Sequence, residues 1–307
     1  MVHALSESDF VLPFDLPDAG LRGRLIRLDA TSTRALSAHA LPEQAARAVC
    51  EMLALAAMLG TALKLDGRLI VQSKGDGPLD LVTVDYLGAE DGRPAGLRGY
   101  ARVDAERFKA LADARPDFDT LVGDGVLAIT IEPRRGEQSY QGIVGLSGDV
   151  ASSAENYFAQ SEQLPTAIRL AAAPVFTPGN AKPAWRAGGI MLQATPERAR
   201  DDDEWERLSL FLKTIEDVEL VDETLAPETL LWRLFHEDEV LVQRAEPLAF
   251  RCDCDTTRIA SVLKSYNEEE RAGLADPDGI IRARCEFCGK VHEIIADELS
   301  PSDSQTD

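Results

Sequence analysis

Basic residues are scarce in this sequence of 307 residues. Only 32 Lys and Arg stand against 53 Asp and Glu, which gives a formal net charge of -21. A nucleic-acid partner requires a basic face that neutralises phosphates, so this charge argues against nucleic-acid binding. It argues in the same way against binding to an anionic membrane surface.

Targeting signals and long apolar runs are also missing. The first twenty residues contain no basic n-region and no apolar h-region, so no signal peptide is expected. The longest apolar run, residues 52–63, is too short to span a bilayer and predicts a buried helix. We therefore expect a soluble cytoplasmic protein, in a compartment that keeps thiols reduced.

The residue sets of common enzymes are absent as well. The sequence has four histidines, and the pair His236-Glu237 lacks the second histidine of a zinc-protease helix. The stretch "GDGP" at residues 75–78 is not followed by Gly-Lys-Ser/Thr, so it is not a nucleotide-binding loop. We expect a protein that is not an enzyme.

Helix and strand patterns mix in the first two thirds of the chain. Residues 42–67 predict a buried helix that begins near Pro42 and ends at Asp66-Gly67. Ser152 and Glu155 have the spacing of a capping box and predict a helix through residue 163. Two β-rich runs at residues 68–86, around a turn at 75–78, predict a hairpin, and residues 123–133 and 140–148 supply a second pair of runs. Residues 166–173 and 187–195 predict further strands. Strands in hairpins with helices between them favour an α+β fold over a doubly wound sheet.

An acidic stretch follows. Residues 201–240 contain fourteen Asp and Glu against three Lys and Arg. Pro227 begins a second helical run in this stretch. The alternative to a linker or client-binding role is that the two runs are ordinary charged surface helices. An apolar stripe at helical spacing runs through this stretch and consists of Trp205, Leu208, Leu212 and Ile215. It predicts a buried helix face, and it is the candidate linker and client surface.

We expect four parts along the chain. They are an N-terminal α+β domain (residues 1–195), an acidic helical linker (196–247), a cysteine module (248–297) and a disordered tail (298–307).

Only five cysteines occur, yet four of them fall within residues 252–288. Clustered cysteines in a reducing compartment indicate metal or redox chemistry rather than structural disulfides. Zinc binds four thiolates tetrahedrally, so Cys252, Cys254, Cys285 and Cys288 predict one zinc ion per chain in the reduced protein. Gly289 allows the backbone to turn back toward the sulfurs. Residues 256–274 predict a helical insert, and residues 279–294 predict a strand, a metal-binding turn and a second strand.

Other readings of the cysteines stay open. The four thiols could be unrelated and buried, or they could form a structural zinc site without any further role. His292 could replace one thiolate as a ligand. Cys50 lies within the apolar helix and is expected to be a small buried hydrophobe.

The short spacing of Cys252 and Cys254 favours a switch over an inert site. A disulfide that closes so small a ring is expected to be strained, and strained disulfides are the labile ones. Thiolates are also the species that peroxide and hypochlorite attack. Oxidation of two ligands removes the metal, and a small module that depends on about 10–16 kcal/mol of apparent zinc binding free energy then unfolds.

The motifs "LLWRLFHED", "FRCDCDTTR" and "GIIRARCEFCG" resemble the redox-regulated 33 kDa heat shock protein family of holdase chaperones. The resemblance continues in "LKLDGRLIVQSKGDGPLDLVTVDY" and "LRGYAR" and covers nearly the whole chain. Two positions depart from the family pattern: Asp255 stands where a small hydroxyl residue is expected, and His292 where an aromatic residue is common.

The resemblance implies an ATP-independent chaperone that is inactive when reduced and zinc-bound. It implies that oxidation joins Cys285 to Cys288 first and Cys252 to Cys254 second, unfolds the C-terminal region and exposes apolar surface to unfolded client proteins. It also implies a homodimer in the oxidised state.

Two competing functions belong to other classes. A thiol–disulfide oxidoreductase would use Cys285 and Cys288, but such enzymes place the attacking cysteine at a helix start near a βαβ unit. A zinc-ribbon nucleic-acid binder conflicts with the acidic charge.

Overall fold

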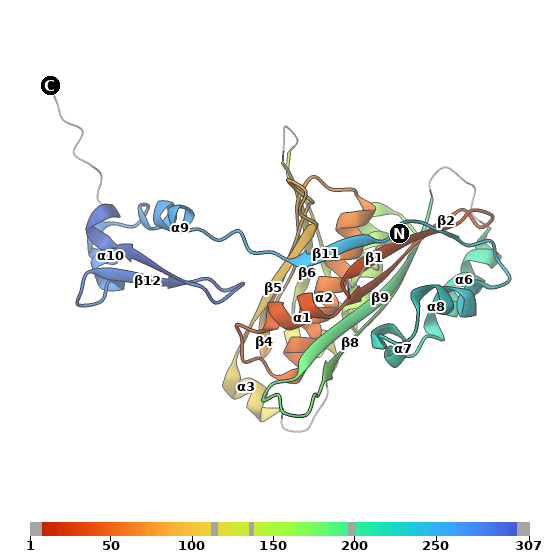
Figure 1. The fold of residues 1–307 in the computed structure, drawn as a ribbon, viewed down its shortest axis with the longest axis horizontal. Helices are drawn as coiled ribbons and strands as arrows, with labels where there is room; N and C mark the ends of the chain where they lie inside the picture. Colours follow the sequence, from red (N-terminus) through yellow and green to blue (C-terminus); the bar gives the residue numbers. More distant parts are fainter. Residues whose placement is uncertain (1–7, 112–115, 135–137, 196–200, 300–307) are drawn as a thin grey trace. The chain divides into compact units, whose positions relative to one another are not determined.

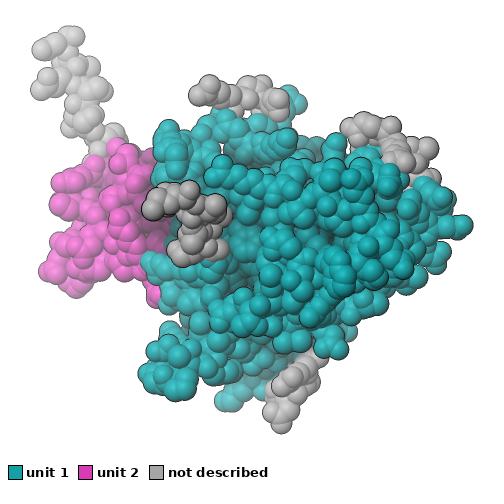
Figure 2. All heavy atoms as spheres, turned by 45° about the vertical axis from the view of Figure 1, so that its right-hand side comes forward, with its two compact units in different colours: residues 1–251 teal, residues 252–307 magenta. Residues whose placement is uncertain are grey.

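The computed structural model describes residues 8–111, 116–134, 138–195 and 201–299. The chain forms two compact units, residues 1–251 and residues 252–307, which Figure 2 shows in different colours. Unit 1 contains two hydrophobic cores and unit 2 contains a small one. The finer division at residues 195, 247 and 297 remains a prediction.

Unit 1 is built on one mixed sheet of eleven strands that curls around a central helix (Figure 1). The strand order is β7-β6-β3-β4-β5-β11-β1-β2-β9-β8, and β10 pairs with β1 off this path. Neighbours pair antiparallel, except that β11 lies parallel to β5. The strands are β1 (Phe10–Leu16), β2 (Leu21–Leu28), β3 (Gly67–Lys74), β4 (Leu79–Leu87), β5 (Ala95–Val103), β6 (Val126–Pro133), β7 (Tyr140–Gly145), β8 (Thr166–Val175), β9 (Ala184–Ala194), β10 (Leu241–Val242) and β11 (Glu246–Phe250).

The predicted hairpin and the second predicted pair are confirmed as the antiparallel pairs β3–β4 and β6–β7. The two further predicted strands are confirmed as β8 and β9, which also pair antiparallel. The alternating pattern of these strands places one face in the core. In β3, for example, Leu69 and Val71 are buried among core residues while the side chains between them are more exposed. The chain therefore mixes helices with a large sheet made mainly of antiparallel pairs.

The central helix α2 (Glu43–Ala62) fills the inside of the curled sheet, beside the short helix α1 (Ala30–Leu36). It is long and apolar enough to cross a membrane, but most of it is buried inside unit 1, as expected of a core helix. Cys50 is fully buried in it, which confirms its predicted place as a small hydrophobe. The helix ends at Ala62, before the predicted stop at Asp66-Gly67, and Lys64 then adopts a left-handed φ of 48°.

Three shorter helices contribute side chains to the main core: α3 (Ala105–Ala110), α4 (Phe118–Val122) and α5 (Val150–Tyr157). The predicted capping box at Ser152 and Glu155 is wrong. The helix begins three residues earlier, because the side chain of Asp149 accepts a hydrogen bond from the Ser152 backbone N–H at 2.7 Å. After Tyr157 the helix continues as a π-helical turn, η1 (Phe158–Glu162).

The acidic stretch forms three helices, α6 (Asp202–Lys213), α7 (Asp217–Val221) and α8 (Pro227–Phe235), with Pro227 at the first turn of α8 as predicted. They lie beside β8 and β9 (Figure 1). Their apolar side chains form a second core with residues of β1, β2, β8 and β9. The chain then returns to the main sheet as β10 and β11.

Unit 2 contains α9 (Thr256–Leu263), α10 (Glu268–Leu274), the hairpin of β12 (Ile280–Arg284) and β13 (Val291–Ile295), and the 3-10 turn η2 (Ala296–Leu299). The predicted helical insert is thus two helices, and Asn267 caps the second one. Residues 298 and 299 of the expected disordered tail belong to η2, and Leu299 is buried. The rest of the predicted tail lies outside the described residues.

Candidate metal and redox centre

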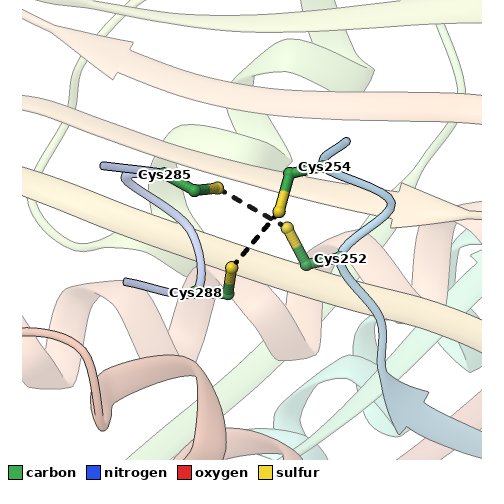
Figure 3. A group of neighbouring side chains, drawn as sticks. All are labelled: Cys252, Cys254, Cys285 and Cys288. Carbon is green, nitrogen blue, oxygen red and sulfur yellow. Dashed lines mark hydrogen bonds between the residues drawn. The ribbon is translucent and has the colours of Figure 1, made fainter. Parts of the chain in front are cut away.

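Two separate segments bring the four cysteines of unit 2 together (Figure 3). Cys252 and Cys254 lie in the chain just before α9, and Cys285 and Cys288 lie in the turn between β12 and β13. In that turn the backbone N–H of Gly289 donates to the Cys285 carbonyl at 2.8 Å. Gly289 has a φ of 73°, a conformation that glycine adopts without steric cost.

The sulfur atoms have the spacing of a metal site. All four lie within 4.8 Å of one another. The Sγ atoms of Cys252 and Cys285 are 3.7 Å apart, and those of Cys254 and Cys288 are 3.5 Å apart. A tetrahedral zinc ion with Zn–S bonds of about 2.3 Å separates its sulfur ligands by roughly 3.8 Å. The donor set therefore fits zinc in both chemistry and dimensions.

The thiol acidities within the cluster diverge. Burial raises the pKa values of Cys252 and Cys254, and the hydrogen bond between Cys254 and Cys288 raises that of Cys254 further. Burial opposes ionisation of Cys288 too, but hydrogen bonds from the Lys290 backbone N–H and from neighbouring thiols hold its pKa below the ordinary value. The turn that carries Cys288 thus makes its thiol more acidic than an ordinary cysteine.

Two side chains flank the cluster at the positions that depart from the family pattern. Asp255 caps α9, because its carboxylate accepts a hydrogen bond from the Arg258 backbone N–H at 2.8 Å. A small hydroxyl residue performs the same role, so the departure keeps the cap. His292 is 2% exposed and contacts both Cys254 and Thr256, but it is outside the group of four clustered metal-ligating residues in the part of the chain that the structure describes.

The unit around the cysteines has little apolar core. Among its described residues, the core cluster has four buried members: Leu263, Ile281, Ile294 and Leu299. Domains with so small a core usually depend on disulfides or a metal for stability. A metal bound by the four cysteines would therefore supply a large share of the stability of unit 2.

The apolar stripe of the acidic stretch is buried, as predicted. Leu208, Leu212 and Ile215 are at most 2% exposed in the second core, and Trp205 packs against it partly buried. Phe14 and Phe235 pack in the same core with their rings tilted by 33° and their centroids 6.0 Å apart. The stripe thus holds α6 against the sheet through ordinary hydrophobic burial.

A second attachment of the acidic stretch was not predicted. The buried guanidinium of Arg27 in β2 donates to the backbone carbonyls of Glu219 (3.0 Å), Leu225 (3.2 Å) and Asp222. Arg169 in β8 adds an ion pair with Asp217 at 2.9 Å. The bonds from Arg27 satisfy backbone carbonyls at and beyond the end of α7. No local sequence signal predicts these bonds, because they join residues nearly 200 positions apart.

Comparisons with known proteins agree with this architecture. Residues 9–294 match the family model described as Hsp33 protein. The chain is 40% identical over 292 residues to the 33 kDa chaperonin of Caulobacter vibrioides, covering 93% of this chain and 94% of that protein. It is 36% identical over 293 residues to the 33 kDa chaperonin of Escherichia coli (strain K12 / DH10B), with the same coverage.

A solved structure shares the fold. The crystal structure of the 33 kDa chaperonin of Thermotoga maritima matches with a TM-score of 0.76 at 20% identity, covering 95% of this chain and 96% of that one. The class is therefore a non-enzymatic chaperone with a four-cysteine cluster consistent with a zinc and redox centre. The chain belongs to the Hsp33 family.

Proposed function

We propose that this protein is a redox-regulated, ATP-independent holdase, inactive while reduced and zinc-bound and activated by oxidation of its four cysteines. The observation that carries the proposal is the spacing of the four sulfur atoms, which suits a single zinc ion. Membership of a chaperonin family supports client proteins as the partners.

In this proposal Cys252, Cys254, Cys285 and Cys288 hold the zinc ion, which keeps their sulfurs as thiolates and links the two halves of unit 2. Oxidation to disulfides removes the ligands. Unit 2 then loses the binding free energy of the metal, and its small apolar core is not enough to keep it folded. A cytoplasmic location provides the reducing conditions of the resting state.

The proposal extends to the acidic stretch. Loss of the folded unit 2 releases residues 201–240 from the sheet, because their fourteen acidic side chains oppose compaction once a neighbouring restraint is lost. The freed stripe of Trp205, Leu208, Leu212 and Ile215, together with the sheet face beneath it, then offers apolar surface to unfolding clients. The oxidised protein assembles as a homodimer.

The oxidoreductase alternative is less well supported by the geometry. Cys285 and Cys288 lie in a turn between two antiparallel strands, whereas an attacking cysteine of that class sits at a helix N-terminus. An inert structural zinc site remains the competing outcome of the experiment below.

Light scattering of a thermally unfolding client enzyme tests the function. Protein treated with peroxide should suppress client aggregation without nucleotide, and the reduced, zinc-loaded protein should not. A Cys50→Ala variant is the matched control, since Cys50 lies in unit 1 and should leave the activation unchanged. Equal protection by reduced and oxidised protein would support the inert site, and a requirement for ATP would exclude the mechanism.

A further inference from the structure

His292 lies beside the cysteine cluster because of the strand pattern. In β13 the residues alternate between exposed and buried, and His292 and Ile294 point inward. Ile294 enters the small core of unit 2, whereas the imidazole of His292 is 2% exposed. A buried imidazole requires partners for both ring nitrogens.

Both ring nitrogens have partners. Nε2 lies 3.4 Å from the Sγ atom of Cys254, and Nδ1 lies 3.1 Å from the hydroxyl oxygen of Thr256. A metal-bound thiolate can only accept a hydrogen bond, so Nε2 must carry the proton and donate it. Nδ1 is then an acceptor, and the Thr256 hydroxyl is its donor. The contacts therefore form one directed chain from Thr256 through His292 to Cys254.

We infer that His292 is a positioning residue that holds the Cys254 sulfur and, through its Nε2–H donor, slows attack of that sulfur on oxidants. This inference rests on the proposed redox function. A charge-assisted hydrogen bond withdraws electron density from a thiolate, and groups that hold metal ligands in this way tune metal affinity and ligand reactivity. Thr256 sets the ring orientation and tautomer.

The step that His292 slows is oxidation by peroxide. The Cys254 thiolate attacks one peroxide oxygen, so that an S–O bond forms while the O–O bond breaks and hydroxide leaves. A second thiolate then attacks the sulfenic sulfur, and a disulfide forms as the S–O bond breaks and a second hydroxide leaves. The two sulfurs together lose the two electrons that peroxide gains. The donated hydrogen bond weakens the nucleophile in the first attack.

Oxidation of Cys254 in the full-length, zinc-loaded protein provides the test, measured by mass spectrometry after short peroxide pulses, beside zinc release to a colorimetric chelator without peroxide. The His292→Phe variant keeps an aromatic ring but lacks the donor, so its Cys254 should be oxidised about ten-fold faster than that of the wild type. His292→Gln, whose amide N–H can replace the Nε2–H donor, should return the rate toward the wild-type value. If His292 only supported the fold, chelator-driven release without peroxide would accelerate by the same factor, and that result would overturn the inference.

Thr256 offers a matched pair of variants that does not alter the ring. Thr256→Val removes the hydroxyl at nearly constant volume and should accelerate the oxidation of Cys254 by peroxide, whereas Thr256→Ser keeps the hydroxyl and should not. This pair decides the question if His292→Phe fails to fold. Equal rates for the two variants would contradict the chain of hydrogen bonds.

Nitrogen NMR of the His292 imidazole in zinc-loaded wild-type protein identifies the tautomer directly, whether or not the protein is activated by oxidation. The Nε2–H tautomer is expected, and an Nδ1–H tautomer would overturn the inference. If the wild-type protein keeps its zinc in peroxide, the proposed function fails. The tautomer still shows whether His292 donates a hydrogen bond to Cys254. If wild-type zinc is released and His292→Phe behaves like the wild type, the function stands and the role of His292 is refuted.

Discussion

The backbone carbonyl of Leu220 in α7 lies so close to Gly188 in β9 that any Cβ atom at position 188 would overlap with it. The glycine therefore sets the distance at which the acidic stretch docks on the sheet. The side chain of Leu220 is fully buried in the second core. Arg27 binds the backbone carbonyl of Glu219 in the same short helix, so both contacts hold α7 against the sheet.

Gly188→Ala should loosen α7 in the reduced protein. The added methyl group meets a backbone atom, which cannot rotate away, so the helix must move. We expect limited proteolysis within residues 201–240 to become several-fold faster and basal suppression of client aggregation to rise. Gly145→Ala in β7 is the control, because a Cβ atom there meets nothing within 4 Å. Equal protease resistance of the two variants would show that the close contact does not restrain α7.

Metal analysis of the reduced protein should find about one zinc per chain, as for a four-thiolate site. Cys288→Ser removes the sulfur whose pKa is lowered and should reduce zinc affinity by orders of magnitude, whereas Cys50→Ala should leave it unchanged. Removal of the metal with a strong chelator should unfold unit 2, visible as loss of its dispersed amide NMR signals. An undiminished affinity in Cys288→Ser would contradict the assignment of ligands.

Peptide mapping of the oxidised protein should find Cys285 joined to Cys288 and Cys252 joined to Cys254, with the first bond formed earlier. This pairing and this order are the ones that the resemblance to the family implies. The sulfur contacts in the structure run between the pairs instead: Cys252 lies 3.7 Å from Cys285, and Cys254 lies 3.5 Å from Cys288. The mapped disulfides therefore distinguish oxidation within each pair from oxidation across these contacts. Disulfides across these contacts would show that oxidation traps the folded cluster rather than opening it.

The elements that depend on local sequence pattern could be predicted from the sequence. Hydrophobic periodicity over short windows predicted the helix around Cys50, the six strands β3, β4 and β6–β9, and the apolar stripe of Leu208 and Leu212. The structure contains all of them. The cysteine pairs were equally clear, because few chemistries need thiols at this spacing.

Long-range pairing could not be predicted in this way. Strand β11 follows the acidic stretch, yet Leu248 pairs with Ala95 and Pro247 with Phe10, across more than 150 residues. Nothing near Leu248 specifies these partners, since any edge with open backbone groups satisfies its hydrogen bonds. The sequence offered His292 only as a replacement ligand. Its hydrogen-bond contact with Cys254 depends on which face of β13 turns inward.

Hydrogen exchange should show that zinc controls the acidic stretch. If the folded unit 2 restrains residues 201–240, their amides should lose protection when zinc is removed. Replacing Leu208 and Leu212 with Ser should remove that protection even with zinc bound, since each loses roughly 1.5–3 kcal/mol of burial free energy. Val218→Ser is the control, because Val218 is exposed on the same stretch. Equal protection with and without zinc would exclude the coupling.

Glu51 in α2 should make the stability of unit 1 depend on pH. Burial raises its pKa to about 8 from an ordinary value of 4.5, and the charges of Asp149 and Asp217 add to the effect while that of Arg47 opposes it. A raised folded-state pKa means that the folded protein holds this proton more tightly than the unfolded chain. The contribution to stability is therefore complete below about pH 4.5 and is lost as the pH rises toward 8.

Glu51→Gln keeps the side chain neutral at every pH, so it should abolish this loss. The variant should match the wild type in free energy of unfolding near pH 5 and exceed it at pH 8 by on the order of a few kcal/mol, at 1.36 kcal/mol per pKa unit. Urea unfolding of the reduced, zinc-loaded proteins at the two pH values measures the difference. Glu43→Gln is the control, because the side chain of Glu43 lies on the same helix and is 53% exposed. A stability difference between Glu51→Gln and the wild type that is the same at both pH values would show that Glu51 ionises as freely in the folded protein as in the unfolded chain.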